Sequence, residues 1–176
     1  MKAFSIARLS ANEARALLPQ LHELLRDAVE ARASVGFLPP LAAAEADDYW
    51  QSVVVALDAG HRVLLVAHEP GAPGELLGTV QLDLATRPNS RLRAEVSKLL
   101  VHTRARRQGL ARQLLQALEA EARQLGRTTL VLDTRQGDIA EQLYQSLGYV
   151  RVGAIPAYFI NHDGQPHATA VYYKLL

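Results

Sequence analysis

The chain has 176 residues, of which 49% are apolar, and this size and composition predict one folded domain that spans residues 1–176. A formal net charge of +1 excludes the strong basic excess of a nucleic-acid binder, and the absence of cysteine excludes disulfides, thiolate metal sites and cysteine nucleophiles. Because no apolar run approaches a membrane span of roughly 18 residues and the chain starts without a signal-peptide pattern, we expect a cytoplasmic protein without a membrane partner.

The first part of the chain predicts one strand and then helices. Residues 3–9 alternate loosely, as a strand does, and Ser10 to Glu13 has the pattern of a helix capping box. Leucines at helical spacing predict a helix over 17–25 that continues toward 33, and Pro19 predicts a kink or a restart within it. A further helix is expected over 42–57.

The rest of the chain alternates strands with helices. We expect a hairpin of strands 63–67 and 76–84 around a turn at 70–74, a strand over 94–101, a helix over 110–125, a short strand over 129–132 that ends in Asp133, a helix over 138–146, and strands over 150–155 and 168–176. This order predicts an α/β fold, a mixed sheet with helices on both faces.

A basic glycine turn joins the strand that ends at Val101 to the helix that follows it. Gly109 lets the backbone approach a ligand closely, and the first N–H groups of a helix, with the helix dipole, favour an anion. Arg106, Arg107 and Arg112 add positive charge, so the segment predicts a pyrophosphate site. The alternative is a basic surface turn before an amphipathic helix.

The spacing Arg106-x-x-Gly109-x-Ala111 fits neither a P-loop nor Gly-x-Gly-x-x-Gly, and it resembles the acetyl-CoA-binding motif of the GNAT superfamily of N-acetyltransferases. Leu143-Tyr144 with Gly148-Tyr149 resembles a second GNAT signature. The resemblance implies the GNAT fold, a twisted mixed sheet of about seven strands, and acetyl-CoA as co-substrate. The residues that it places against acetyl-CoA are Leu99, Leu100, Val101, Arg106, Arg107, Gln108, Gly109, Leu110, Ala111, Arg112 and Tyr144.

The same resemblance implies roles for individual side chains. Tyr144 becomes the general acid that protonates the leaving thiolate of CoA, whereas the plainer interpretation is a core tyrosine with its hydroxyl at the surface. Many relatives have an asparagine seven residues before this tyrosine that helps to hold CoA; Gly137 stands there, so that contact is lost or replaced by Gln136 or Asp138.

Two carboxylates are candidate bases, because an amine must be neutral to attack a thioester. Glu95 matches a glutamate that deprotonates the acceptor in several GNAT enzymes, and its alternative is an edge carboxylate paired with Arg93 or Lys98. Asp133 follows a buried strand, where open α/β sheets place ligands, and its alternative is a local turn.

No metal site is expected, because none of the six histidines has a metal-binding helical spacing. No serine lies in a Gly-x-Ser-x-Gly elbow, which favours direct transfer from acetyl-CoA to the amine. The backbone N–H of Leu100 or Val101 would polarise the thioester carbonyl, as the family implies.

The C-terminal half, from Arg93 onward, is most similar to the tabtoxin-resistance acetyltransferase branch of the family. The expected function is therefore N-acetylation of a primary amine on a small amino-acid-like metabolite or toxin, bound around Phe37 and Tyr158. The alternatives are a protein or peptide N-acetyltransferase and a non-catalytic acyl-CoA-binding module. A homodimer is expected by analogy with relatives alone.

Overall fold

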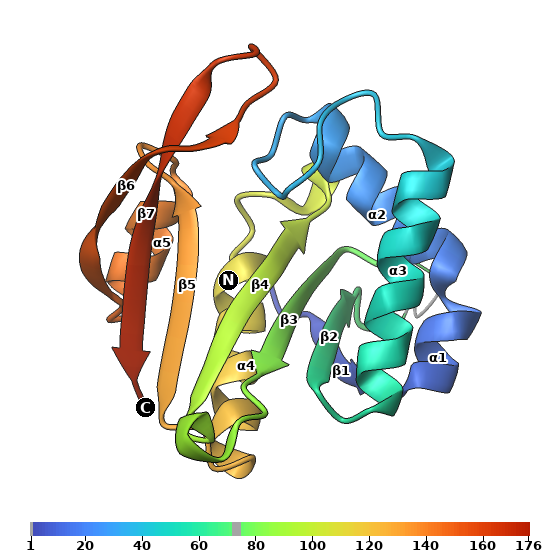
Figure 1. Cartoon of the computed structure of the whole chain (residues 1–176). Coiled ribbons are helices and arrows are strands. Elements are labelled where there is room, and N and C mark those ends of the chain that lie inside the picture. Colours follow the sequence, from blue (N-terminus) through green and yellow to red (C-terminus); the bar gives the residue numbers. More distant parts are fainter. Residues whose placement is uncertain (1, 72–74) are drawn as a thin grey trace.

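The computed structural model describes residues 2–71 and 75–176, which form a seven-stranded sheet with helices on both faces (Figure 1). In chain order the elements are β1 (Ser5–Leu9), α1 (Ala11–Ala16), α2 (Leu18–Glu30), α3 (Ala43–Asp58), β2 (Arg62–His68), β3 (Gly78–Leu84), a 3₁₀ turn (Pro88–Ser90), β4 (Arg93–Val101), a second 3₁₀ turn (Thr103–Ala105), α4 (Leu110–Gln124), β5 (Thr129–Arg135), α5 (Ala140–Ser146), β6 (Val150–Ile160) and β7 (Pro166–Leu175). The strand order is β1-β2-β3-β4-β5-β7-β6. The predicted mixed sheet flanked by helices is confirmed.

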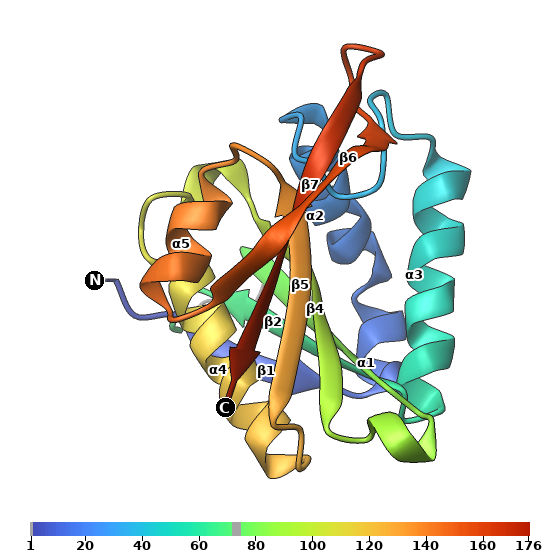
Figure 2. The same cartoon turned by 60° about the vertical axis from the view of Figure 1, so that its left-hand side comes forward.

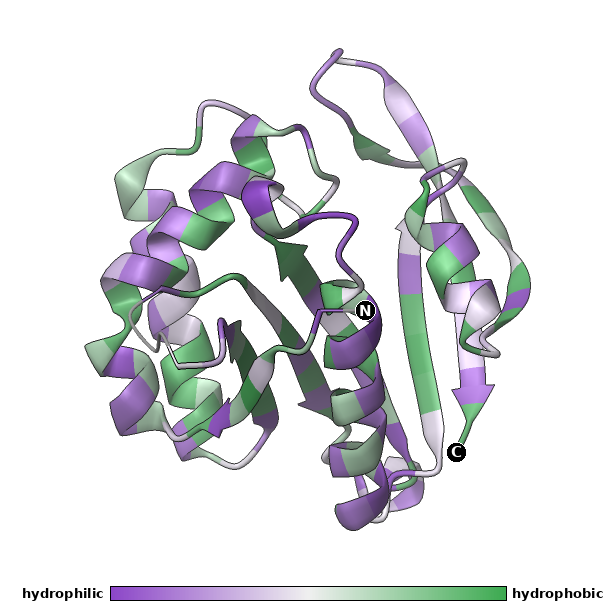
Figure 3. Cartoon of the chain, turned by 180° about the vertical axis from the view of Figure 1, so that it is seen from behind, coloured by the Kyte–Doolittle hydropathy of each residue, from purple (hydrophilic) through white to green (hydrophobic). Residues whose placement is uncertain are grey.

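Two apolar cores lie on opposite faces of the sheet. In β2, Val63 and Leu65 join the core under α4, whereas Leu64 and Val66 join the core under α1–α3, because successive side chains of a strand point to opposite faces. Figure 3 shows the sheet as a largely apolar layer, with hydrophilic residues on the outward side of α4. Burial on both faces explains why β2 is continuously apolar in sequence.

The helix start and the break that the sequence predicts are both present. The Ser10 hydroxyl accepts the Glu13 N–H at 3.3 Å, and the Glu13 carboxylate accepts the Ser10 N–H at 2.8 Å, which completes the capping box. The first helix ends at Ala16 and α2 restarts at Leu18, with Pro19 in the first turn, where its missing N–H costs no hydrogen bond. The second helix ends at Glu30, three residues before the expected end.

Several strand boundaries differ from the sequence expectation. The prediction that β5 ends at Asp133 is wrong, because pairing with β7 continues to Arg135 opposite Thr169. For the same reason β6, paired along β7, runs to Ile160 instead of 155. The expected turn at 70–74 lies partly outside the described residues.

Gly78 begins β3, where a strand was expected from residue 76, and it permits close packing. A Cβ there would lie 2.8 Å from the Leu100 carbonyl oxygen and 3.0 Å from a Leu114 methyl carbon. The missing side chain thus lets β3, β4 and α4 approach one another.

The sheet opens at its centre, between β4 and β5. These parallel strands pair only over Arg93–Glu95 and Thr129–Val131, within the part of the chain that the structure describes. Beyond Glu95 they diverge toward their C-terminal ends, and the β6–β7 hairpin extends past the opening (Figures 1 and 2). Beyond Glu95, the edge of β4 that faces β5 is therefore left without a strand partner, while the other edge stays paired with β3. No helix in residues 2–71 or 75–176 has the length and apolar character needed to cross a membrane.

Candidate active site

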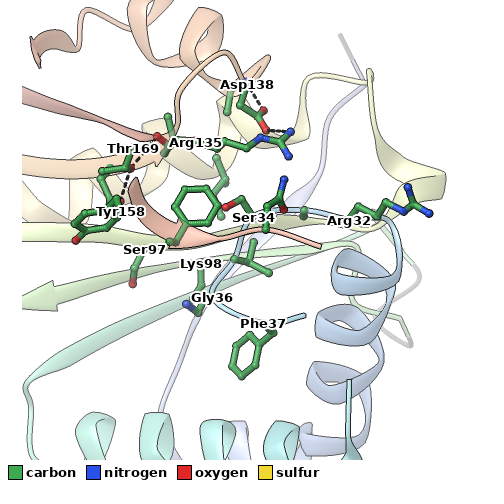
Figure 4. A pocket seen from close by; sticks show the side chains of 18 of the residues that line it. Arg32, Ser34, Gly36, Phe37, Ser97, Lys98, Arg135, Asp138, Tyr158 and Thr169 are labelled. Carbon is green, nitrogen blue, oxygen red and sulfur yellow. Dashed lines mark hydrogen bonds and ion pairs between the residues drawn. The ribbon is translucent and has the colours of Figure 1, made fainter. Parts of the chain in front are cut away.

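The opening between β4 and β5 leads into a cavity of about 560 Å³ (Figure 4). The cavity brings together Glu95, Asp133 and Tyr144, which come from β4, β5 and α5 and were all predicted as site residues. Phe37 and Tyr158, expected near the acceptor, also line it. Its volume is in the range of small-molecule sites.

Tyr144 lies on α5 with its ring buried and its side chain lining the cavity. The ring packs edge-on against Tyr149, with centroids 5.7 Å apart, and tilted against Tyr172 at 6.1 Å. Burial raises the pKa of the Tyr144 phenol, and the charges of Asp138 and Asp133 raise it further. The hydroxyl is thus protonated at neutral pH, as a proton donor must be.

The two carboxylates occupy different environments. Glu95 is exposed, but partial desolvation raises its pKa, and the carboxylates of Asp83 and Asp133 add to that effect. Asp133 accepts a hydrogen bond from the Thr169 hydroxyl at 2.7 Å. The local turn considered for Asp133 is absent, since its carboxylate bonds across to β7 and its backbone continues the strand.

Gly137, which replaces the family asparagine, adopts φ +83°, a left-handed conformation that glycine and asparagine tolerate best. The neighbouring Asp138 accepts the Ala140 N–H at 3.0 Å and pairs with Arg135 at 3.0 Å. Both Asp138 and Arg135 line the cavity (Figure 4). Of the two replacements considered from the sequence, Asp138 and not Gln136 lies at the cavity wall.

The basic glycine turn has the geometry of an anion site. Gly109 adopts φ +86° and precedes α4, and the first amide to bond back into the helix is that of Gln113, which donates to the Gly109 carbonyl at 3.2 Å. The amides of Leu110, Ala111 and Arg112 therefore have no partner within the helix. Such amides, at the positive end of the helix dipole, suit a phosphate group.

The three arginines predicted to bind pyrophosphate differ in their hydrogen bonds. Arg106 donates from Nε to the Val101 carbonyl at 3.2 Å, and Arg112 donates to the Ser146 hydroxyl at 2.7 Å. Arg107 is exposed and adopts φ +60°. The Arg112 bond ties the start of α4 to α5, the helix of Tyr144. Of the remaining predicted contacts, Leu99 of β4 lines the cavity, whereas Leu100, Val101 and Gln108 do not, and the Leu100 side chain is buried in the core under α1–α3.

Two site features escaped the sequence analysis. Asp27 of α2 accepts the Thr103 backbone N–H at 2.8 Å and the Thr103 hydroxyl at 2.7 Å, and so holds the start of the glycine turn. Lys98, considered only as an ion-pair partner of Glu95, lies at a β-bulge and lines the cavity. A signal for Lys98 was present, since a lysine inside an apolar strand is unusual. None existed for Asp27, which is 76 residues from Thr103.

Among residues 2–71 and 75–176, no group of three or more His, Asp and Glu side chains is placed to hold a metal ion.

The chain is similar to known acetyltransferases in sequence and in structure. The family model described as Acetyltransferase (GNAT) family matches residues 18–149. A ribosomal-protein-alanine N-acetyltransferase from Brucella melitensis is 24% identical with a TM-score of 0.80, over 98% of this chain and 99% of that chain. The putative acetyltransferase yncA from Salmonella typhimurium, solved with its cofactor acetyl-CoA, is 22% identical with a TM-score of 0.77, over 99% and 95% of the two chains. A putative phosphinothricin N-acetyltransferase is 18% identical with a TM-score of 0.78, over 99% of each chain. The chain therefore belongs to the GNAT family of acetyl-CoA-dependent N-acetyltransferases.

Proposed function

We propose that this enzyme transfers the acetyl group of acetyl-CoA directly to a primary amine of a small molecule about the size of an amino acid. The observation that carries the proposal is the single cavity lined by Tyr144, Glu95 and Asp133. It adjoins β4, the strand that leads into the basic glycine turn. The transfer requires a proton donor, a proton acceptor and an anion site, and the two carboxylates supply the acceptor and a group that can bind the acceptor ammonium.

In the proposed mechanism, the pyrophosphate of acetyl-CoA binds the amides at the start of α4 and the charges of Arg106, Arg107 and Arg112. The unpartnered edge of β4 holds the acyl arm, and the N–H of Leu100 or Val101 polarises the thioester carbonyl. Glu95 or Asp133 takes the proton of the acceptor ammonium. The neutral amine attacks the carbonyl carbon and forms a tetrahedral adduct. As the adduct collapses, the C–S bond breaks and Tyr144 donates its phenolic proton to the CoA sulfur. The former amine nitrogen loses its second proton, which restores the Tyr144 phenol through solvent.

Glu95 is the stronger candidate for the base. The pKa of Glu95 is raised toward neutral pH, and a general base is most effective when its pKa lies near the working pH. The Asp133 carboxylate, in contrast, already accepts a hydrogen bond from the Thr169 hydroxyl. Asp133 then binds and orients the acceptor ammonium.

A peptide acceptor is the second candidate, favoured by the structural likeness to the ribosomal-protein-alanine N-acetyltransferase. The segments that surround the cavity favour a small acceptor instead. Residues 32–39 line one side, and Tyr158 to His162, from the end of β6 onward, line another, so the cavity is bounded by side chains from two separate segments. The resemblance of the C-terminal half to the tabtoxin-resistance acetyltransferase branch agrees with a small acceptor, and the proposal retains it. A homodimer, expected by analogy, and a cytoplasmic location remain part of the proposal.

The test begins with thermal unfolding with and without acetyl-CoA. A ligand at about a hundred times its Kd adds about 2.7 kcal/mol of stability, which corresponds to an increase in Tm of roughly 5–10 °C. No shift at millimolar acetyl-CoA would contradict cofactor binding.

The second step measures thiol release with a panel of amines. We expect Tyr144→Phe to lower kcat by roughly 10²–10⁴ while the acetyl-CoA shift persists. Tyr173→Phe, a matched change outside the cavity, serves as the control. Full activity in Tyr144→Phe would refute the general-acid role, and binding without transfer to any amine would favour a non-catalytic module.

A further inference from the structure

We propose that Lys98 determines acceptor specificity by binding the carboxylate of an amino-acid acceptor, whose amine faces Glu95 and Asp133. The inference rests on the proposed function and narrows its acceptor to molecules that carry both an ammonium and a carboxylate. It assigns a role to a charged residue that the transfer mechanism does not use.

The backbone aims Lys98 at the acceptor end of the cavity. The register between β3 and β4 shifts between Thr79 and Gln81, and Lys98 adopts φ +48° in the resulting bulge. A lysine in the left-handed region is strained, by of order 1 kcal/mol or more, and such strain persists where the surrounding structure holds it, often at functional sites. The bulge redirects a side chain that regular alternation would place on the opposite face from Ser97.

The neighbours of Lys98 show that its side chain lies on the same face of the sheet as that of Ser97. Its Nζ lies 5.6 Å from the Phe37 ring centroid and 5.3 Å from that of Tyr49, in the layer that covers this face of the sheet. The Tyr49 hydroxyl bonds to Gln81, the cross-strand partner of Ser97, so Ser97 and Lys98 share one face. Figure 4 shows Lys98 beside Gly36 and Phe37 at the cavity wall.

The ammonium group of Lys98 has hydrogen-bonding capacity to spare. It makes no ion pair or hydrogen bond with any residue in 2–71 or 75–176, although an ammonium carries three donors. The aromatic rings attract the positive charge but satisfy none of these donors with an oxygen. Burial lowers the pKa of Lys98, and the charge of Arg62 lowers it further, which is the expected cost of an ammonium that lacks an anionic partner. A bound carboxylate would supply that partner.

The remaining charges of the cavity match an amino acid. Arg135 and Asp138 neutralise each other in an ion pair. Arg32 also lines the cavity without an ion pair to a described residue, but it is exposed to solvent. The partly buried Lys98 shares the cavity with Glu95 and Asp133, neither of which forms an ion pair with a described residue. A simple amine would use the carboxylates and leave Lys98 without a partner, whereas an amino acid presents both charges a few ångströms apart. The amino terminus of a peptide lacks a carboxylate at that distance.

The experiment compares free L-amino acids with their primary amides as acceptors, using thiol release from acetyl-CoA. The variants are Lys98→Met, which removes the charge at similar length, and the matched control Lys2→Met, an exposed lysine that pairs with Glu69. Because amidation also changes the basicity of the amine, the quantity measured is the acid-to-amide ratio of kcat/KM in each protein. An unchanged acetyl-CoA shift in Lys98→Met verifies that the variant folds.

We expect Lys98→Met to lower the acid-to-amide ratio by on the order of ten- to a hundredfold, the range for a lost hydrogen bond to a charged group. The loss should appear in KM for the acid, with kinetics for the amide little changed, and Lys2→Met should keep the wild-type ratio. A ratio that Lys98→Met leaves unchanged overturns the proposal. So does a wild-type enzyme that acetylates no free amino acid although acetyl-CoA stabilises it. Absence of acetyl-CoA stabilisation overturns the proposed function instead.

Discussion

At the scale of single residues, Glu95, the proposed base, lowers the stability of the folded protein when its carboxyl is ionised. Its pKa is raised in the folded protein, so the folded state holds the Glu95 proton more tightly than the unfolded chain does. Its contribution to stability is therefore fully present below the unfolded pKa and is lost as the pH rises through the folded pKa. At neutral pH the ionised carboxylate destabilises the fold.

We predict that Glu95→Gln is more stable than the wild type at pH 7 and much less active, because glutamine cannot ionise and cannot accept the proton of the acceptor. Urea unfolding at pH 7 and pH 4 measures the first part, and the stability difference should shrink at pH 4. The pH dependence of kcat/KM measures the second, since the wild type should lose activity as the pH falls through the raised pKa of Glu95.

Asp133→Asn distinguishes the two carboxylates. If Asp133 only orients the acceptor, this variant should raise KM for the amine and keep the acidic limb of the pH profile. Loss of that limb in Asp133→Asn, with its retention in Glu95→Gln, would make Asp133 the base.

How far the sequence predicts the site depends on where each residue's partners lie. Tyr144 and Gly109 stand in short local patterns, so their places could be predicted. The environment of Asp133 depends on Thr169, which is 36 residues away on a strand whose pairing no local pattern encodes. The orientation of Lys98 depends on a bulge, which appears only when the register of two strands is known.

At the scale of elements, α2 supports the glycine turn through one side chain. Asp27 binds both the backbone N–H and the hydroxyl of Thr103, at the point where β4 passes into the turn. In the proposed function, the amides at the start of α4 bind acetyl-CoA, so the position of the turn matters for binding. Within the turn, the Ala105 N–H donates to the His102 carbonyl at 2.8 Å, and the Gln108 side chain donates to the Arg104 carbonyl at 2.9 Å.

We predict that Asp27→Ala weakens acetyl-CoA binding by roughly tenfold, which corresponds to about 1.4 kcal/mol. The direction of the change in acetyl-CoA affinity distinguishes a charge effect from a displacement of the turn. Removing a negative charge near an anion site should strengthen binding by simple electrostatics, so weaker binding can arise only from a displaced turn. Calorimetric titration with acetyl-CoA measures the Kd.

Asp58→Ala is the control, because Asp58 is an exposed carboxylate that pairs with Arg15 away from the turn. Tighter binding in Asp27→Ala would show that the carboxylate acts through its charge and leaves the turn in place.

Element boundaries followed the sequence where a local signal ends the element. The capping box fixes the start of α1, and Pro19 marks the restart of α2 within two residues. The lengths of β5 and β6 were underestimated, because each strand continues as far as its partner β7 provides hydrogen bonds. Strand length is thus a property of the pair, whereas a helix start that a capping box or a proline marks is encoded in its own residues.

At the scale of the whole molecule, the opening between β4 and β5 divides the sheet into two parts, which other contacts must hold together. Three register pairs join β4 to β5, and Arg127 donates to the carbonyls of Ala85 and Arg91 beside them. A further connection is ionic. Lys174 of β7 binds Glu119 of α4, with 2.6 Å between Nζ and Oε2, and both side chains are largely buried.

We predict that Lys174→Met destabilises the protein by about 3–5 kcal/mol, because it leaves the buried Glu119 carboxylate without a counter-charge. Adding Glu119→Leu should restore most of that loss, since an apolar pair of similar volume replaces a buried ion pair at little cost. Urea unfolding of the single and double variants at pH 7 measures both.

The same pair connects stability to the active site. The Lys174 ammonium lies 5.3 Å from the Tyr149 ring centroid, and that ring packs against Tyr144. If the two parts of the sheet move apart in Lys174→Met, acetyl-CoA binding should weaken in the single variant and recover in the double variant. A double variant as unstable as the single one would show that the geometry of the ion pair, and not the uncompensated charge, holds the two parts together.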